Sequence, residues 1–375
     1  MQSSQSESIK KDGLYIHFEE TYNNRKAGIL NKIYGQLEAF NKFGYSFDIV
    51  SFTNKYTLCL NGKVVLKLPS RLLLFRYLIF SKIYSVIKKK KYSIIYIRYV
   101  GSDKPFLHFL KKLHQRKCIT WIEFPTFPYE GELKPKNYLE KLVVKNDLKY
   151  REYLHKYINK AISFTYDGTI LNIPTIKLEN GVSFNQIPLI KKNAISDYLV
   201  LIGVANISVW HGYDRIIMGL KEYYNTNRTF KVYFKVVGEG GALSKLKELT
   251  ETYNLSGYVD FYGSKKGDPL NKIFSEAHIA IGSLGMHRIG LEKGSILKLG
   301  EYLARGFATI IGYEDFSIKE PESFIMQVPP DETAVNIDDV VAFYRNQSLS
   351  QEAIRAFAQR RFSWEDKIKK ILPPG

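Results

Sequence analysis

The sequence predicts an α/β protein with two domains, each built on a doubly wound parallel sheet. Short apolar runs alternate with amphipathic stretches, which is the pattern of parallel strands joined by helices. The alternation lapses across the polar, irregular residues 174–197 and then resumes. With 375 residues, the chain also exceeds the length that one hydrophobic core comfortably serves. We therefore expect two domains that face each other across a cleft at the carboxyl ends of their strands.

In the first half, apolar runs predict strands at 14–18, 47–52, 92–100 and 118–124. Helical periodicity lies between them, at about 29–43, 71–91 and 104–116. In the second half, strands are predicted at 197–205, 230–238, 257–263 and 278–284. Helices are predicted there at 213–224, 242–253, 269–276 and from about Ser295. The lapse at 174–197 is the predicted linker.

The charge of the chain is unevenly distributed. Its formal net charge is +18, and residues 63–117 hold 15 Lys and Arg residues against one acid, Asp103. A basic half of this kind favours an anionic partner, which is a membrane surface, a nucleic acid or a phosphorylated substrate. No zinc-finger, RNP-type or other nucleic-acid-reading motif accompanies the charge, so we expect no nucleic-acid partner.

The predicted helix at 71–91 carries much of this charge. Its basic residues include Arg71, Arg76, Lys88, Lys89, Lys90 and Lys91. A bilayer-spanning helix needs about 20 apolar residues, and the apolar run here is shorter and interrupted by Arg76. A basic amphipathic helix can instead lie in the interface of an anionic membrane. The alternative is a surface helix whose lysines face water.

The cysteines, the N-terminus and the histidines bear on compartment and cofactors. Cys59 and Cys118 lack CxxC or metal-ligand spacing, so we expect reduced thiols that pack as small hydrophobic residues. The N-terminal stretch MQSSQSESIKKDG is polar, and no apolar signal segment follows it. The histidines and acidic residues show no metal-ligand spacing. These features predict a cytoplasmic protein without a dedicated metal site.

Residues 287–306, HRIGLEKGSILKLGEYLARG, hold a dense set of reactive side chains with three competing interpretations. Ser295 and Lys298 match the Ser-x-x-Lys of penicillin-interacting enzymes, but the Ser-Asp-Asn and Lys-Thr-Gly elements of those enzymes are missing. The stretch can equally be a plain helix with Ser295 as N-cap and Gly306 at its C-terminus. The third interpretation is a cradle for a phosphorylated ligand, because a helix N-terminus binds anions and basic residues precede it.

Glycine loops and loop histidines add candidate ligand contacts. VVGEGG at 236–241 follows a strand, but Leu243 stands where a dinucleotide fingerprint has its third glycine. Gly28 lies in the first strand–helix loop, where a backbone could approach a ligand. Either loop can also be a simple turn. His211 and His287 lie in loops at strand ends and are candidates for the site.

Several stretches together resemble the retaining glycosyltransferases of family GT4, above all the bacterial capsule and lipopolysaccharide enzymes. In order, they are RKAGILNKIYGQLEAF, IIYIRY, IEFPTFPYEGE, WHGYDRIIMGL, VVGEGG, VDFYGS, SLGMHRIGLEKGSILKLGEYLARGFATI and FSWEDKIKKIL. The resemblance covers nearly the whole chain. It implies a GT-B fold of two Rossmann-like domains, at 1–190 and 191–350, and a C-terminal helix, 351–375, that packs back on the first domain.

The resemblance also implies the roles of candidate residues. The second domain would hold a nucleotide-sugar, with Glu301 on the ribose and Lys298 and Ser295 at the diphosphate. The other donor contacts selected are Gly28, His211, Arg215, Gly238 and Gly263. The residues selected for catalysis are Glu292, His287 and Arg288. The acceptor contacts selected in the first domain are Arg98, Glu123, Thr126, Tyr129 and Glu130.

Two positions depart from the family pattern. Lys293 stands where the family has its first glutamate. Val204 follows Gly203 in a region where the family has a basic pair, and His211 lies near the place of its lysine. Arg215, His287 or Arg288 could supply the missing positive charge.

The sequence therefore predicts an enzyme that transfers a sugar, with retention, from a nucleotide-diphosphate sugar, with uridine as the preferred base. The acceptor implied by the resemblance is a saccharide on a polyprenyl diphosphate, at the inner face of the cytoplasmic membrane. No metal or other cofactor is expected. The alternatives are a non-catalytic GT-B module that binds a nucleotide or a partner, a nucleotide-sugar epimerase of similar fold, and a basic membrane-binding protein without an active site.

Overall fold

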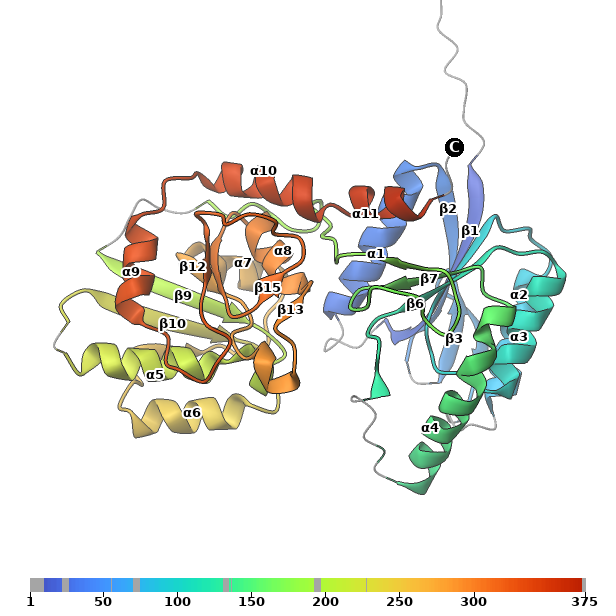
Figure 1. The fold of residues 1–375 in the computed structure, drawn as a ribbon, viewed down its shortest axis with the longest axis horizontal. Coiled ribbons are helices and arrows are strands. Elements are labelled where there is room, and N and C mark those ends of the chain that lie inside the picture. The colour runs from blue at the N-terminus through green and yellow to red at the C-terminus, as the bar shows by residue number, and fades with distance from the viewer. Residues whose placement is uncertain are drawn as a thin grey trace, which may run out of the picture. The chain divides into compact units, whose positions relative to one another are not determined.

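The computed structural model describes residues 10–21, 27–54, 56–69, 75–130, 135, 137–191, 197–226 and 228–372. The chain forms two compact units (Figure 1). Unit 1 comprises Met1–Glu179 with Trp364–Gly375, and unit 2 comprises Asn180–Ser363. Each unit is an α/β sheet of the doubly wound type, which confirms the predicted fold class.

Unit 1 contains an eight-stranded sheet in the order β4-β3-β2-β1-β5-β6-β7-β8. Its strands are β1 (Lys11–Glu20), β2 (Tyr45–Phe52), β3 (Thr57–Leu60), β4 (Lys63–Lys67), β5 (Ile94–Arg98), β6 (Thr120–Phe124), β7 (Lys160–Ser163) and β8 (Thr175–Lys177). Its helices are α1 (Ala27–Lys42), α2 (Arg76–Ile87), α3 (Lys104–Gln115), α4 (Tyr138–Tyr150) and α11 (Trp364–Ile371). β1 pairs in parallel with both β2 and β5, so the strand order reverses beside β1.

The hairpin β3–β4 is an element that the predicted scheme lacks. β3 runs antiparallel to β2 and to β4. Asn61 and Gly62 connect the two strands with φ angles of 51° and 77°, and a two-residue hairpin turn of type I′ needs this left-handed backbone. β4 forms the edge of the sheet and carries Lys63 and Lys67, which is a common protection of an exposed edge.

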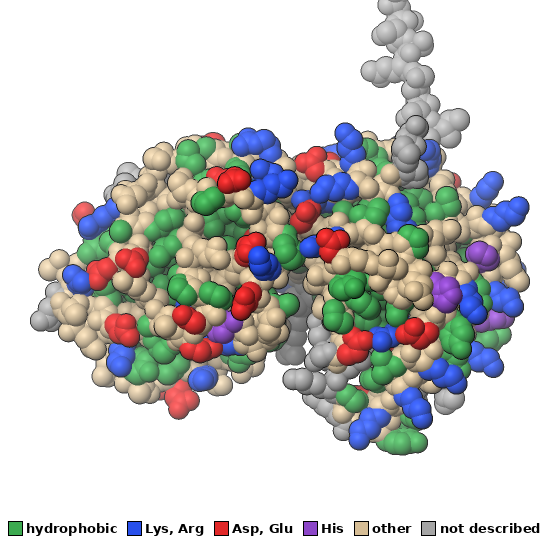
Figure 2. All heavy atoms as spheres, in the orientation of Figure 1, with side chains coloured by type: hydrophobic (Ala, Val, Ile, Leu, Met, Phe, Trp, Pro, Cys, Tyr) green, Lys and Arg blue, Asp and Glu red, His purple; other side chains and the backbone are tan. Residues whose placement is uncertain are grey.

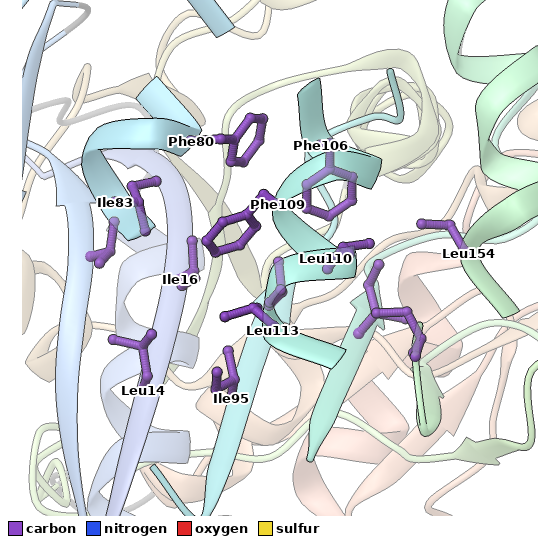
Figure 3. Close-up of a cluster of buried hydrophobic side chains, with 14 of the residues drawn as sticks. Leu14, Ile16, Phe80, Ile83, Ile95, Phe106, Phe109, Leu110, Leu113 and Leu154 are labelled. Carbon is purple, nitrogen blue, oxygen red and sulfur yellow. The ribbon is translucent and has the colours of Figure 1, made fainter. Parts of the chain in front are cut away.

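Helices cover both faces of the unit 1 sheet. α2 and α3 pack on one face over a buried cluster that includes Ile16, Phe80 and Leu110 (Figure 3). α1 and α11 pack together over the other face, where Tyr15 and Trp364 belong to a second cluster. Each large apolar side chain buried in this way stabilises the fold by about 1.5–3 kcal/mol before entropic costs.

Unit 2 contains a six-stranded parallel sheet in the order β11-β10-β9-β12-β14-β16. Its strands are β9 (Tyr198–Val204), β10 (Lys231–Val237), β11 (Val259–Phe261), β12 (Ile279–Ile281), β14 (Ala308–Ile311) and β16 (Ile325–Gln327), beside the short pair β13 (Lys293–Gly294) and β15 (Glu314–Asp315). Its helices are α5 (Tyr213–Tyr224), α6 (Leu243–Thr252), α7 (Gly267–Ser275), α8 (Leu297–Ala304), α9 (Ile337–Arg345) and α10 (Gln351–Phe362).

The units divide at places that differ from the predicted boundaries. The first unit ends at Glu179 rather than at residue 190, because the residues that follow bond to unit 2. Asn180 N donates to Ser295 Oγ at 2.8 Å, and Ile190 N donates to Arg305 O at 3.1 Å. In the terminal segment, α10 belongs to unit 2, where it packs on α8, and α11 belongs to unit 1, where it packs on α1.

Candidate functional site

The carboxyl edge of the unit 2 sheet is the place where a ligand of this fold would bind. β9 lies between β10 and β12, and ligands of doubly wound sheets bind beside such a reversal of strand order. Glycines let the loops after these strands pack closely. A Cβ on Gly238 would lie 1.8 Å from Ala205 O, and one on Gly212 would lie 2.7 Å from Gly285 N. Gly238 N also donates to Gly263 O at 2.8 Å, so both of these predicted donor-site glycines belong to this edge.

Lys298 lies in the first turn of α8 and is a cation without a bonded carboxylate. Its Nζ lies 3.5 Å from the hydroxyl oxygen of Tyr213 and 5.7 Å from the centre of that ring. Among the residues that the structure describes, no salt bridge reaches Lys298. Burial lowers the pKa of Lys298 to about 7, although the charge of Glu301 acts in the opposite direction. An anion bound here would therefore supply a counter-charge that the protein itself supplies only weakly.

His211 lies near Lys298 as a neutral imidazole. Burial, helped by the charge of Lys298, lowers the pKa of His211 to about 2. Its Nδ1 accepts a hydrogen bond from Ser208 N at 2.9 Å, which assigns the ring proton to Nε2. His211 can thus donate a hydrogen bond at this edge, but it does not replace the missing basic residue.

Glu301 lies on α8 within one turn of Lys298. Burial raises the pKa of Glu301, while the charges of Arg305 and Lys298 lower it. The neighbouring Tyr302 anchors this helix to the end of β9, because its hydroxyl accepts from Val204 N at 2.9 Å and donates to Val204 O at 3.2 Å. That anchor holds an acid and a base side by side at the carboxyl edge of the sheet.

His287 and Arg288, both predicted as catalytic, form a cluster with Glu332. His287 Nε2 and Arg288 Nε lie 2.8 Å and 2.9 Å from the same carboxylate oxygen of Glu332. Arg288 also holds Asp214 with two hydrogen bonds of 2.9 and 2.8 Å and donates to Val209 O at 2.8 Å. The hydrogen bonds from Arg288 and His287 lower the pKa of Glu332 to about 2. Both basic side chains therefore already have an anionic partner within the protein.

Arg215, Ser295 and Glu292 lie differently from the predicted scheme. Arg215 is fully buried, and it donates to Thr333 O at 2.7 Å and to Leu284 O at 2.6 Å, so it joins loops of unit 2. Ser295 is not an N-cap, because α8 begins at Leu297 and the Ser295 hydroxyl instead accepts from the backbone of Asn180. Glu292 is exposed in the loop before β13.

Glu123, predicted to contact an acceptor, lies fully buried at the centre of a polar network in unit 1. It accepts from Gln36 Nε2 at 2.9 Å and from the Tyr96 hydroxyl at 2.7 Å. Lys32 Nζ lies 3.3 Å from its other oxygen, which also pairs with Arg98. Burial alone would raise the pKa of Glu123, but Lys32, Arg98 and the hydrogen bonds lower it to about 2.

The other predicted contacts in unit 1 have varied surroundings. Tyr129 donates to Asp147 Oδ2 at 2.6 Å, and Glu130 pairs with Arg151 at 2.7 Å. Thr126 is partly buried in the loop after β6. Gly28 lies inside α1 rather than before it, and a Cβ there would meet nothing within 4 Å, so its position does not require glycine.

The basic residues predicted to face a membrane do not act as one group. Arg71 lies outside the described residues. Arg76 pairs with Asp103 and donates to Val100 O and Gly101 O, and Lys90 pairs with Asp12 and Asp48. Lys88, Lys89 and Lys91 are exposed. The face that carries α2 and α3 shows several Lys and Arg side chains (Figure 2).

The described part of the chain lacks both a membrane-spanning helix and a metal-ligand cluster. None of its helices has the length and apolar character that crossing a membrane demands. Its His, Cys, Asp and Glu side chains form no cluster of three or more that could hold a metal ion.

Sequence reasoning missed five residues on which these clusters depend: Lys32, Gln36, Asp147, Tyr213 and Glu332. Lys32 and Gln36 lie four residues apart on α1, and that spacing was a sequence signal for one polar position on a buried helix face. Asp147 accepts from Tyr99, Ser102 N and Tyr129, which come from distant loops. Nothing in the local sequence announces such partners.

Comparisons with known proteins place the fold. Neither a model of a protein family nor a curated protein sequence matches the chain. Sucrose-phosphate synthase from Thermosynechococcus elongatus matches with a TM-score of 0.65 at 15% identity, over 96% of this chain and 97% of that one. Anabaena HepE in complex with UDP-glucose matches with a TM-score of 0.61 at 11% identity, over 96% of this chain and 98% of that one. The lipopolysaccharide outer core galactosyltransferase WaaB matches with a TM-score of 0.54 at 11% identity, over 96% of this chain and 98% of that one. The chain therefore has the GT-B fold of two Rossmann-like units.

Proposed function

We propose that the chain is a glycosyltransferase that uses a nucleotide-diphosphate sugar as its donor. The observation that carries the proposal is the partly buried Lys298, which has no carboxylate ion pair among the described residues and lies beside Glu301 at the carboxyl edge of the unit 2 sheet. The first turn of a helix also offers free backbone N–H groups and a positive dipole end to a diphosphate. The UDP-glucose bound by HepE, which has a similar fold, supports uridine as the base.

The site supplies electrostatic stabilisation of the leaving group. During transfer, the bond between the sugar carbon and the diphosphate oxygen breaks while a bond to the acceptor oxygen forms, and the acceptor proton passes to the departing diphosphate. Lys298 and the amides of the α8 turn would stabilise the charge that develops on that diphosphate. Glu301 would accept hydrogen bonds from the ribose, and His211 would donate one from Nε2. Transfer proceeds with retention, as in family GT4, and without a metal ion.

The acceptor in this proposal is a saccharide on a polyprenyl diphosphate, bound by unit 1 at the cytoplasmic face of a membrane. The concentration of positive charge in residues 63–117 supports an anionic, membrane-borne acceptor. Because Glu123 is fully buried, we assign it to the support of Arg98 rather than to direct contact. Surface polysaccharide synthesis is the process that fits such a donor and acceptor.

A second candidate is a non-catalytic GT-B module that binds a nucleotide or a partner. Two observations favour it. Lys293, at the place of the first glutamate of the GT4 family, is exposed and paired with Glu314 at 2.6 Å. His287 and Arg288 are held by Glu332. Turnover of a nucleotide-sugar by the purified protein would exclude this candidate.

Thermal unfolding with UDP, GDP, ADP and TDP, each with and without EDTA, tests the donor site. A nucleotide at a hundred times its Kd stabilises by about 2.7 kcal/mol, which is readily measured. We expect a shift with UDP that is indifferent to EDTA. Glu301→Ala removes a bond to a charged group worth about 1.5–3 kcal/mol and should raise the donor KM roughly 10- to 100-fold. Normal activity of this variant would contradict the assignment of Glu301.

A further inference from the structure

The helix α4 of unit 1 is unusual because it is almost uncovered. Of its thirteen residues, all of them described, only Asp147 is buried. Figure 1 shows α4 extending away from the sheet of unit 1, with its N-terminal end farthest out. A helix of a soluble protein normally hides an apolar stripe against its own core, and α4 does not.

The two N-terminal turns of α4 form an apolar tip, which comprises Tyr138, Leu139, Leu142, Val143 and Val144. The exposed fractions are 73% for Tyr138, 54% for Leu139 and 43% for Val143, while Leu142 and Val144 are partly exposed. These are among the exposed large apolar side chains of the described residues, and Leu139 and Val143, four residues apart, are neighbours on one side of the helix. Adjoining exposed apolar residues of this kind mark a contact with a partner or a membrane.

Hydrogen bonds fix α4 near its C-terminal end and cap it at its N-terminus. Asp147 accepts a hydrogen bond from Ser102 N at 2.6 Å, one from Tyr129 at 2.6 Å and another from Tyr99. Asn137 caps the helix by accepting from Glu140 N at 2.9 Å. α4 is therefore a positioned element and not a loose segment.

The charge around the tip is positive. Lys141, Lys145 and Lys149 are exposed on α4, and the one other exposed charged residue of this helix is Glu140. Asp147 is buried and its carboxylate is occupied by hydrogen bonds. Apolar residues with lysines among and directly after them suit an anionic bilayer, where the apolar groups enter the interface and the lysines meet headgroups.

We propose that the apolar tip of α4 inserts into the interface of an anionic membrane, with Lys141 and Lys145 on the lipid headgroups. This docking would bring the carboxyl edge of the unit 1 sheet to the membrane, where the acceptor of the proposed function resides, and it rests on that function for its purpose. It moves the membrane contact away from α2 and the lysines that follow it, because Arg76 and Lys90 already have carboxylate partners.

Sedimentation of the full chain with vesicles tests the proposal. The vesicles are phosphatidylcholine alone or with about 30% phosphatidylglycerol, at low and high salt. We expect binding to the anionic vesicles, weakened by salt. Lys141→Gln with Lys145→Gln should weaken it roughly 30-fold, because each lysine near such a surface is worth about a fivefold factor. Leu139→Ser with Val143→Ser should weaken it at least tenfold.

Matched variants control for exposure and charge. Val64→Ser with Ile119→Ser removes apolar side chains that are likewise 54% and 43% exposed in unit 1. Lys88→Gln with Lys89→Gln removes two exposed lysines beside α2. Both pairs should bind within about threefold of the unchanged chain. Equal binding by the α4 variants, an equal loss in the control pairs, or no binding by the unchanged chain would each overturn the proposal.

The UDP-induced thermal shift, measured on the same variants, separates this inference from the proposed function. The α4 variants should keep the full shift, because α4 lies in unit 1 and the donor site in unit 2. Vesicle binding that maps to the tip without any nucleotide effect would leave the docking surface standing and remove the transferase proposal. A UDP-induced thermal shift without vesicle binding at α4 would leave the transferase proposal standing and remove the docking surface.

Discussion

The carboxyl edges of the two sheets treat their charged groups in opposite ways. In unit 1, Glu123 is surrounded by Lys32, Arg98 and two neutral donors, and the network is closed. In unit 2, Lys298 is partly buried, and its surroundings are Glu301 one turn along the helix, without a salt bridge, and the hydroxyl of Tyr213. The same fold thus carries one polar cluster that is complete and one that is not.

The difference distinguishes charged side chains that are paired within the protein from charged side chains that are able to pair with a ligand. A buried ion that is paired on all sides stabilises the state in which it is paired, and little remains for it to bind. A buried ion without a partner costs free energy in the empty protein, and it regains that energy when a counter-ion arrives. By this argument we expect the anion site in unit 2, and we expect the Glu123 network of unit 1 to be a structural support.

Removal of the charge of Glu123 should have the largest effect on stability. Glu123→Gln leaves Lys32 and Arg98 buried with one carboxylate fewer, and breaking such a pair costs about 3–5 kcal/mol. The measurement is urea unfolding followed by tryptophan fluorescence, because Trp121 and Trp364 are buried in unit 1.

Glu365→Gln is the matched control for this experiment. It removes the carboxylate of the surface pair with Lys42, whose side chain is 52% exposed, and should cost less than about 1 kcal/mol. A Glu123→Gln protein as stable as this control would show that the unit 1 network is not needed for the fold, and the comparison between the units would fail.

Lys298 should make nucleotide binding depend on pH. Its pKa of about 7 in the empty protein must rise when a diphosphate binds, so binding takes up a proton above pH 7. The nucleotide itself is fully ionised there, since phosphate groups have a second pKa of about 6. We therefore expect the Kd for UDP to rise roughly tenfold between pH 7.5 and 8.5 and to be measurable by calorimetry.

Two substitutions check that Lys298 causes this dependence. Lys298→Arg keeps its charge at every pH used and should flatten the profile. Lys298→Met should bind UDP weakly at every pH. It should also unfold at a higher urea concentration at pH 7, because the folded state no longer holds a lysine whose pKa is lowered to about 7. A steep profile that persists in Lys298→Arg would place the titrating group elsewhere.

The architecture was largely predictable, because alternating apolar runs report directly on parallel strands and crossover helices. α5 was predicted at the residues where it lies, and most of the other predicted elements deviate by a few residues at their ends. No prediction was made for β7, β8, β14, β16 and α9. The β3–β4 hairpin was missed although Asn61-Gly62 is a strong local turn signal. α4 was also missed, since its apolar residues do not form the stripe by which a helix facing a core is recognised.

The site was predictable only in part, because charge partners come from distant residues. The place of Lys298 and Glu301 on one helix follows from their spacing in the sequence. The local sequence does not reveal that Arg215 donates its hydrogen bonds to the carbonyl oxygens of Thr333 and Leu284. It also does not reveal the hydrogen bond between Ser295 and Asn180. Sequence identifies which side chains can do chemistry, whereas the fold decides which of them are still available.

Glu332 offers the smallest and sharpest test of that availability. Its carboxylate holds His287 and Arg288 but is itself 63% exposed, so Glu332→Gln should cost less than about 1 kcal/mol. If the diphosphate competes with this carboxylate for Arg288, the substitution should tighten UDP binding by up to about fivefold. Glu314→Gln, which breaks the similarly exposed pair with Lys293, should leave UDP binding unchanged. Weaker UDP binding in Glu332→Gln would mean that Glu332 shapes the anion site instead of competing with its ligand, and Arg288 would then join Arg215 among the structural charges.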